Sequence, residues 1–206
     1  MARDFELIGG RSCLDFVNTM SGLRVLRPEE RLLDYGDLLA WAEQSRLLSR
    51  AEAEGLRREA AQHPRRAAEA VAAALSLREA LHAVLLAALR GRRPDEGALG
   101  AVNGWVAAAL QERRLRPTGR GFALRFDERP GELLAFLRPV ALSAQELLAS
   151  DQLLRVHLCA EAEADRCGWI FLDETKNGTR RFCSMRDCGN RAKARRHYAR
   201  VKEERS

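Results

Sequence analysis

Apolar side chains in the first 150 residues recur every three or four positions, which is the spacing of one helix face. The longest such stretch follows Pro64, a residue that suits the first turn of a helix, and continues to about Arg90. We therefore predict a long helix whose apolar side faces a core. That side carries Val71, Leu75, Leu77, Leu81, Val84, Leu85 and Leu89.

Capping patterns mark the starts of shorter helices. Ser12 is a candidate N-cap for the apolar stretch 13–19, and Ser49 with Glu52 has the spacing of a capping box for a helix toward His63. Further helices are predicted to begin at Asp34 or Tyr35, to run over 95–114, and to run over 132–149 with a division at Pro139.

Between Pro117 and Gly131 the apolar residues no longer recur every three or four positions but at every second position. Phe122, Leu124 and Phe126 alternate with polar or small residues, which predicts a β-strand. A strand needs a partner, and the candidate partners are the segments near Leu7 and over Arg113–Arg116.

A second β segment is predicted near the C-terminus. Trp169–Leu172 is apolar, Asn177-Gly178 is a strong hairpin turn, and Thr179–Phe182 would return as the second strand and lead to Cys183. We expect a mainly α protein with a small β component. Residues 1–150 form a helical N-terminal domain, and residues 151–206 form a small C-terminal module.

Four cysteines dominate the C-terminal module. Cys159 and Cys167 form one pair, and Cys183 and Cys188 form the other. Four thiolates fill a tetrahedral zinc shell, and a closed shell is structural. The alternatives are ordinary reduced thiols, a redox-switch disulfide, or His157 in place of Cys159.

The remaining cysteine lies far upstream. Cys13 is predicted to be a core thiol. No apolar run reaches the ~18 residues of a membrane helix, and the N-terminus lacks the apolar segment of a secretory signal. We therefore expect a cytoplasmic protein without a membrane partner, whose thiols stay reduced.

Positive charge is concentrated behind the cysteines. Residues 180–206 hold ten Arg or Lys and three Asp or Glu, whereas the other 179 residues hold 25 basic and 26 acidic side chains. This asymmetry favours a polyanionic partner, DNA first and RNA second. A solvated basic tail is the plain alternative. The candidate contacts are Arg180, Arg181, Arg191, Lys193, Arg195, Arg196 and Arg200.

The order of cysteine pair, hairpin, cysteine pair and helix resembles a treble-clef finger with a ββα arrangement. More specifically, Cys183-Ser184-Met185-Arg186-Asp187-Cys188-Gly189-Asn190-Arg191 resembles the CGNR zinc finger. Leu14-Asp15-Phe16-Val17-Asn18-Thr19 resembles the opening of the ABATE domain, which precedes this finger in bacterial proteins described as stress-induced transcription regulators. The resemblance implies structural zinc, DNA binding and a place at the nucleoid. Phe182 stands where the family usually has Trp, and the first cysteine pair is more widely spaced than usual.

The N-terminal domain is the candidate input of such a regulator. Asp15, Asn18 and Thr19 would line a polar pocket for a small-molecule effector, or would only cap a helix. Dimerisation is another role for the domain. We find no pattern of a catalytic triad, phosphate loop or HExxH site, so we do not expect an enzyme. Three other hypotheses for the function stay open: an RNA- or ribosome-associated protein, an enzyme with a structural finger, and a thiol switch.

Overall fold

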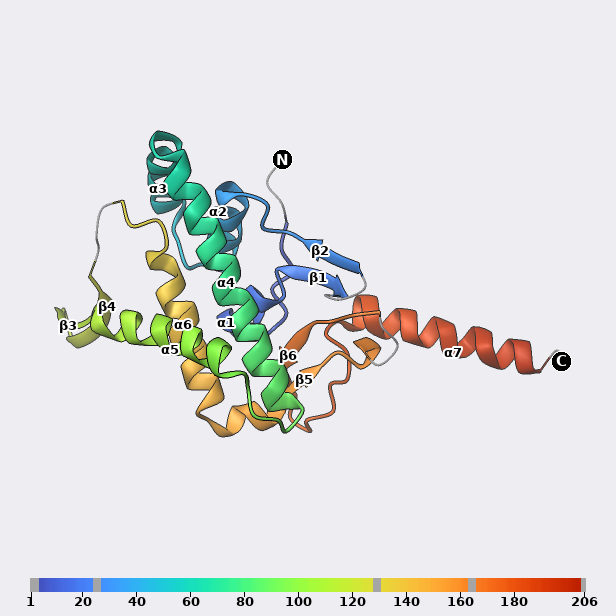
Figure 1. Ribbon diagram of the computed structural model, residues 1–206. Coiled ribbons are helices and arrows are strands. Elements are labelled where there is room, and N and C mark those ends of the chain that lie inside the picture. Colours follow the sequence, from blue (N-terminus) through green and yellow to red (C-terminus); the bar gives the residue numbers. More distant parts are fainter. Residues whose placement is uncertain (1–3, 24–26, 128–130, 163–165, 205–206) are drawn as a thin grey trace.

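The computed structural model describes residues 4–23, 27–127, 131–162 and 166–204 (Figure 1). Within those ranges the N-terminal part contains the helices α1 (Ser12–Val17), α2 (Tyr35–Gln44), α3 (Arg50–Gln62), α4 (Pro64–Leu89), α5 (Glu96–Gln111) and α6 (Arg138–Leu148), the last preceded by the 3-10 turn η1 (Ala135–Leu137). It also contains the antiparallel strand pairs β1 (Met20–Leu23) with β2 (Arg27–Glu30), and β3 (Arg113–Thr118) with β4 (Gly121–Phe126).

The C-terminal part is built from short elements and one long helix. In order they are the 3-10 turn η2 (Asp151–Arg155), β5 (Val156–Leu158), the 3-10 turn η3 (Ala160–Ala162), β6 (Ile170–Leu172), the π-helical turn η4 (Met185–Gly189) and α7 (Asn190–Glu203). This confirms the predicted fold class of a mainly helical protein with a small β component and a C-terminal ββα finger.

Of the three helix starts predicted before Pro64, two are confirmed. The Asp34 carboxylate accepts a hydrogen bond from the Asp37 N–H at 2.8 Å and caps α2. Ser49 and Glu52 form the expected reciprocal capping box at the start of α3. The third expectation was wrong by one residue, because Arg11 is the N-cap of α1 and its carbonyl accepts the first helical hydrogen bonds.

The long helix α4 runs through the centre of the N-terminal part, with α1, α2, α3 and α5 packed against it (Figure 1). By length and hydropathy α4 would suffice to cross a membrane, although polar residues interrupt its apolar sequence. Such helices also occur as core helices, and Leu77, Leu81 and Leu85 of α4 are buried in the core. The property is therefore weak evidence for a membrane span.

A buried arginine ties α4 to the β1–β2 ribbon. Arg78 is 1% exposed, and its guanidinium donates two hydrogen bonds to the Glu30 carboxylate at 2.7 and 2.5 Å. It also donates to the Thr19 hydroxyl at 3.2 Å. Burial would raise the pKa of Glu30, but the hydrogen bonds from Arg78 and from the backbone outweigh it and lower that pKa. The ion pair thus stabilises the junction of α1, α4 and β2.

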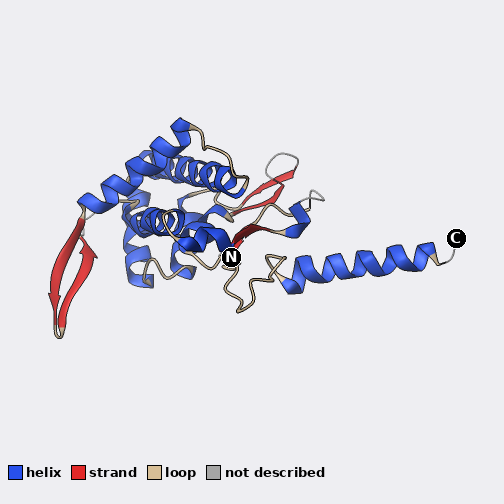
Figure 2. Cartoon of the chain, turned by 90° about the horizontal axis from the view of Figure 1, so that it is seen from below, coloured by secondary structure: helices blue, strands red, loops and turns tan. Residues whose placement is uncertain are grey.

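The strand predicted over 122–126 is confirmed, and its partner is the segment 113–118 rather than the one near Leu7. The β3–β4 hairpin projects from the body at the end opposite to α7 (Figures 1 and 2).

The predicted C-terminal hairpin was partly wrong. β6 lies where expected, but it pairs with β5 instead of with 179–182. The other edge of β6 is occupied by groups from outside the module. The Leu172 N–H donates to the Gly9 carbonyl, and the Asn18 amide bonds to Ile170. Residues 179–182 therefore have no free strand edge to join.

The side chains of β6 alternate between two cores, as strand geometry requires. Ile170 and Leu172 pack with the N-terminal helices, whereas Phe171 packs with Trp169 and the four cysteines of the finger. The finger and the N-terminal part are thus joined through one strand.

Candidate metal centre and nucleic-acid interface

The structure brings the four predicted ligands together. Cys159 follows β5, Cys167 precedes β6, Cys183 lies just before η4, and Cys188 lies within it. All four are buried, and their Sγ atoms lie within 4.8 Å of one another. The sulfurs of Cys167 and Cys183 are 3.6 Å apart, as are those of Cys183 and Cys188.

These separations fit zinc. Four sulfurs placed tetrahedrally at a Zn–S distance of about 2.3 Å lie roughly 3.8 Å apart. A disulfide would need about 2.05 Å. His157 is not required as a ligand, because Cys159 completes the set and the His157 ring packs on Phe171 at 6.0 Å.

Crowding of the thiols shows why a cation is needed. Hydrogen bonds from Cys167 and Cys183 lower the pKa of Cys159, and the same contacts with Cys159 raise the pKa of Cys167 and of Cys183. One thiolate thus suppresses ionisation of its neighbours. A divalent cation among the sulfurs favours all four thiolates and so couples its binding to folding of the module.

The turn that carries Cys188 is shaped by its neighbours in the motif. The Ser184 hydroxyl accepts a hydrogen bond from the Asp187 N–H, and the Gly189 N–H donates to the Ser184 carbonyl at 2.9 Å. A Cβ on Gly189 would lie 2.7 Å from the sulfur of Met185, whose flexible and half-exposed side chain would have to move aside. Asn190 then donates from its amide to the Arg186 carbonyl at the start of α7.

Three of the seven predicted nucleic-acid contacts have partners within the finger, and a fourth, Arg200, forms an exposed ion pair with Glu204 at 3.7 Å. Arg191 donates to the Cys188 sulfur at 3.4 Å, a bond that raises the pKa of Arg191 and stabilises the thiolate. Arg195 bonds to the buried carboxylate of Glu161. Arg180 is the third, and it has a different environment.

Arg180 lies inside the finger. Its guanidinium donates to four backbone carbonyls and lies 4.3 Å above the Phe171 ring. The carbonyls belong to Ile8, Leu172, Phe182 and Cys183. Most of the N–H donors of Arg180 are thus already bonded, which leaves few for a phosphate, and its contact with nucleic acid stays a prediction.

Asp173, which accepts a hydrogen bond from the Arg180 N–H, stabilises the same loop. The Asp173 carboxylate accepts hydrogen bonds from the Thr175 hydroxyl and N–H and from the Arg180 N–H. Hydrogen bonding from Thr175, more than any other contact, lowers the pKa of Asp173 to about 2. This loop takes the place of the expected second strand.

The four other predicted contacts are exposed. Lys193, Arg196 and Arg200 form a stripe along α7 at helical spacing, and Arg181 lies on the preceding loop. α7 extends away from the body, so its sides are open to a large partner (Figure 2).

A hollow of about 260 Å³ lies at the root of α7 and gathers four arginines, Arg166, Arg181, Arg195 and Arg196. Glu161 also lines it and is bonded to Arg195. The candidate contacts predicted from the sequence begin at Arg180 and do not include Arg166. Its position directly before a zinc ligand is the signal that could have found it.

The family comparisons agree with this geometry. Residues 155–201 match the CGNR zinc finger, and residues 10–151 match the ABATE domain, described as "Putative stress-induced transcription regulator". The chain belongs to the ABATE family. No curated protein matches the chain.

Asp15, Asn18 and Thr19, the residues of the predicted effector pocket in the ABATE domain, form hydrogen bonds within the protein. Asp15 accepts a hydrogen bond from the Gly9 N–H at 2.8 Å, and burial raises its pKa to about 6. Asn18 bonds to Ile170, and the Thr19 hydroxyl donates to the Phe16 carbonyl. These side chains join parts of the protein, which is the structural alternative.

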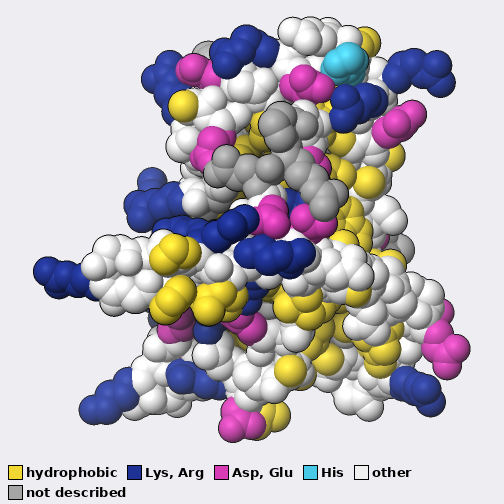
Figure 3. All heavy atoms as spheres, turned by 90° about the vertical axis from the view of Figure 1, so that its left-hand side faces the viewer, with side chains coloured by type: hydrophobic (Ala, Val, Ile, Leu, Met, Phe, Trp, Pro, Cys, Tyr) yellow, Lys and Arg dark blue, Asp and Glu magenta, His cyan; other side chains and the backbone are white. Residues whose placement is uncertain are grey.

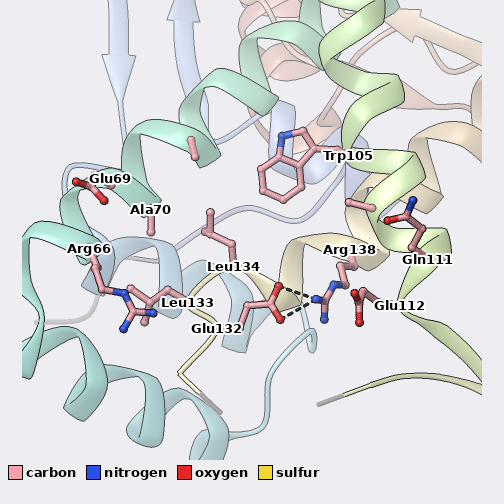
Figure 4. A pocket seen from close by; sticks show the side chains of 12 residues that line it. Arg66, Glu69, Ala70, Trp105, Gln111, Glu112, Glu132, Leu133, Leu134 and Arg138 are labelled. Carbon is pink, nitrogen blue, oxygen red and sulfur yellow. Dashed lines mark hydrogen bonds and ion pairs between the residues drawn. The ribbon is translucent and has the colours of Figure 1, made fainter. Parts of the chain in front are cut away.

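A cavity of about 560 Å³ lies elsewhere in the ABATE domain, between α4, α5 and the segment leading to α6 (Figure 4). Trp105 and Leu134 supply apolar walls, and Glu112 lies beside the ion pair of Arg138 with Glu132. Its volume suits a small organic molecule.

Cys13 behaves as expected for a core thiol. It is fully buried in α1, and burial raises its pKa to about 11.

Proposed function

We propose that this protein is a zinc-dependent transcription regulator that binds double-stranded DNA through α7 and the arginines at its root, in the cytoplasm at the nucleoid. The observation that best supports this proposal is the hollow at the root of α7. It is lined by Arg166, Arg181, Arg195 and Arg196. Arginine guanidinium groups bind phosphate in a bidentate manner, and a fixed helix can lie in a major groove.

The zinc site orients this surface. Ala160 donates its N–H to the Arg181 carbonyl at 2.8 Å, next to Cys159. Arg191 bonds to Cys188, and Arg195 bonds to Glu161. Because these contacts join α7 to the ligand-bearing loops, zinc binding fixes where the exposed cations point.

The ABATE domain supplies the input in this proposal, through an effector in the cavity beside Trp105. The role is binding rather than catalysis. Pairing of two copies on a two-fold DNA site stays a prediction, which molecular mass in solution would test.

The test uses the zinc-loaded full chain, selection of bound sequences from random duplexes, and fluorescence anisotropy across salt concentrations. The α7 variant Lys193→Gln/Arg196→Gln/Arg200→Gln should bind DNA more weakly. The slope of the logarithm of the binding constant against the logarithm of salt concentration should become shallower by up to about 2.7, since each phosphate contact contributes about 0.9. The control Arg58→Gln/Arg65→Gln/Arg92→Gln removes the same charge from exposed positions and should behave like wild type. Equal effects of the two triple variants would reject the proposal. Stronger binding of structured RNA than of DNA at matched salt would assign the surface to RNA instead.

A further inference from the structure

The β3–β4 hairpin has one apolar face that the body does not cover. Its register places Leu115 opposite Leu124 and Pro117 opposite Phe122, so these side chains share a face. Leu115 is 63% exposed, Phe122 71% and Leu124 51%. Figure 3 shows apolar side chains beside Lys and Arg on the side of the molecule that carries this hairpin. An exposed apolar face of this kind marks an interaction site.

The opposite face carries Arg114, Arg116 and Arg125, whereas Arg120 lies in the turn and Arg113 on the apolar face. Residues 113–127 contain five arginines and one acidic residue, Asp127. Asp127 pairs with Arg116 at 2.5 Å and with Arg114 at 3.7 Å. Arg114 lies directly opposite Arg125, an arrangement of like charges that destabilises a ribbon in isolation. A polyanion beside the ribbon would relieve this repulsion.

The apolar face alone is too small to hold a second copy of the chain. Its exposed side chains offer roughly 400 Å², about half of the ~800 Å² that each partner buries in a stable interface. A two-stranded ribbon does fit a DNA groove, and apolar side chains at its tip can wedge between base pairs in the minor groove. Pro117 and Phe122 form such a pair next to the turn that contains Arg120.

We propose that the β3–β4 hairpin is a second binding site for double-stranded DNA. Arg120 and Arg125 contact the phosphates, and Phe122 with Pro117 presses against a base step. The hairpin and α7 extend from opposite ends of the molecule (Figures 1 and 2), so they contact separate duplex segments and the protein bridges them. The inference rests on the proposed function for the segment bound at α7.

The experiment measures bridging and binding separately with the zinc-loaded full chain. An immobilised random-sequence duplex is incubated with protein and then with a fluorescent duplex, and retained fluorescence reports bridging. Wild type should retain the second duplex. Arg120→Gln/Arg125→Gln and Phe122→Ala should each lose most retention while binding the first duplex through α7. The control Arg58→Gln/Arg92→Gln should bridge like wild type. Bridging by the hairpin variants at the wild-type level would overturn the inference.

A second measurement isolates the hairpin in the α7 triple variant. We expect this variant to keep residual DNA binding at low salt. Because two phosphate contacts remain in the hairpin, its affinity should fall about tenfold between 50 and 200 mM salt. Adding Arg120→Gln/Arg125→Gln should abolish it. Absence of any residual binding would reject the hairpin site and leave the proposed function standing. Wild-type affinity of the α7 triple variant would reject the proposed function and the bridging that rests on it, and would leave the hairpin site standing.

Two other partners would overturn the inference. If Phe122→Ala lowers the molecular mass from dimer to monomer without changing DNA binding, the face belongs to a second copy. If it abolishes binding to phosphatidylglycerol vesicles without changing DNA binding, the face belongs to a membrane. Circular dichroism and zinc content should equal wild type in every hairpin variant, because the substituted side chains are exposed.

Discussion

The side-chain amide of Asn18 bonds to both backbone groups of Ile170, although 152 residues separate them. Nδ2 donates to the Ile170 carbonyl at 2.8 Å, and Oδ1 accepts from the Ile170 N–H at 3.0 Å. The amide thus replaces a neighbouring strand at the edge of β6. One side chain at the end of α1 thereby holds the finger against the ABATE domain.

Replacement of Asn18 should loosen this junction. Asn18→Asp keeps the acceptor but loses the donor, which leaves the buried Ile170 carbonyl facing a carboxylate oxygen. We expect a loss of about 1–3 kcal/mol in the free energy of unfolding, measured by urea denaturation. The control Asn103→Asp makes the same change at an exposed position of α5. Equal stability of the two variants would show that the Asn18 bonds contribute nothing.

Loss of a zinc ligand should unfold the finger. Structural zinc supplies about 10–16 kcal/mol of apparent binding energy in small finger peptides, so Cys188→Ser should lose bound zinc and the helicity of α7. Because Ile170 and Leu172 belong to the N-terminal core, the variant should also lower the thermal midpoint of the ABATE domain. Metal analysis and circular dichroism measure both effects.

The control for zinc loss is Cys13→Ala, which removes a thiol from α1 and should keep the full zinc content. Retention of stoichiometric zinc by Cys188→Ser, with α7 ordered, would contradict the four-cysteine site.

Two adjacent arginines should behave in opposite ways. Arg180→Gln removes the donor of four carbonyl contacts and should cost about 1–3 kcal/mol of stability. Arg181→Gln changes an exposed side chain and should leave stability within about 0.5 kcal/mol, while it weakens DNA binding. Denaturation and anisotropy on the same samples separate the effects. A reversed pattern would place Arg180 in the interface.

The raised pKa of Asp15 gives stability a dependence on pH. Its folded-state value is about 6, above the ordinary 3.8, so the folded protein holds this proton more tightly than the unfolded chain does. Stability from this group therefore falls as pH rises from about 4 to about 6 and then levels.

Asp15→Asn lacks this titration and keeps an acceptor for the Gly9 N–H. The thermal midpoint of Asp15→Asn minus that of wild type should therefore increase between pH 4 and pH 7. The exposed Asp4→Asn serves as control. A difference that does not change with pH would show that Asp15 titrates normally.

The sequence predicted what local chemistry determines. The capping residues Asp34 and Ser49, the long helix after Pro64 and the four cysteines are each specified by spacing and residue type. The sequence did not distinguish Arg180 from Arg181, because both lie in one polar loop and only tertiary contacts separate them. It also missed β5, whose three residues lack a turn signal, and it could not reveal that Asn18 pairs with a strand far along the chain.

The alternation of Ile170 and Phe171 between two cores has a practical consequence. A fragment that stopped after α6 would leave a socket of apolar side chains empty, and an excised finger would present Ile170 and Leu172 to water. We therefore expect neither half to be soluble and folded when it is expressed alone, although the two family matches suggest a boundary between them.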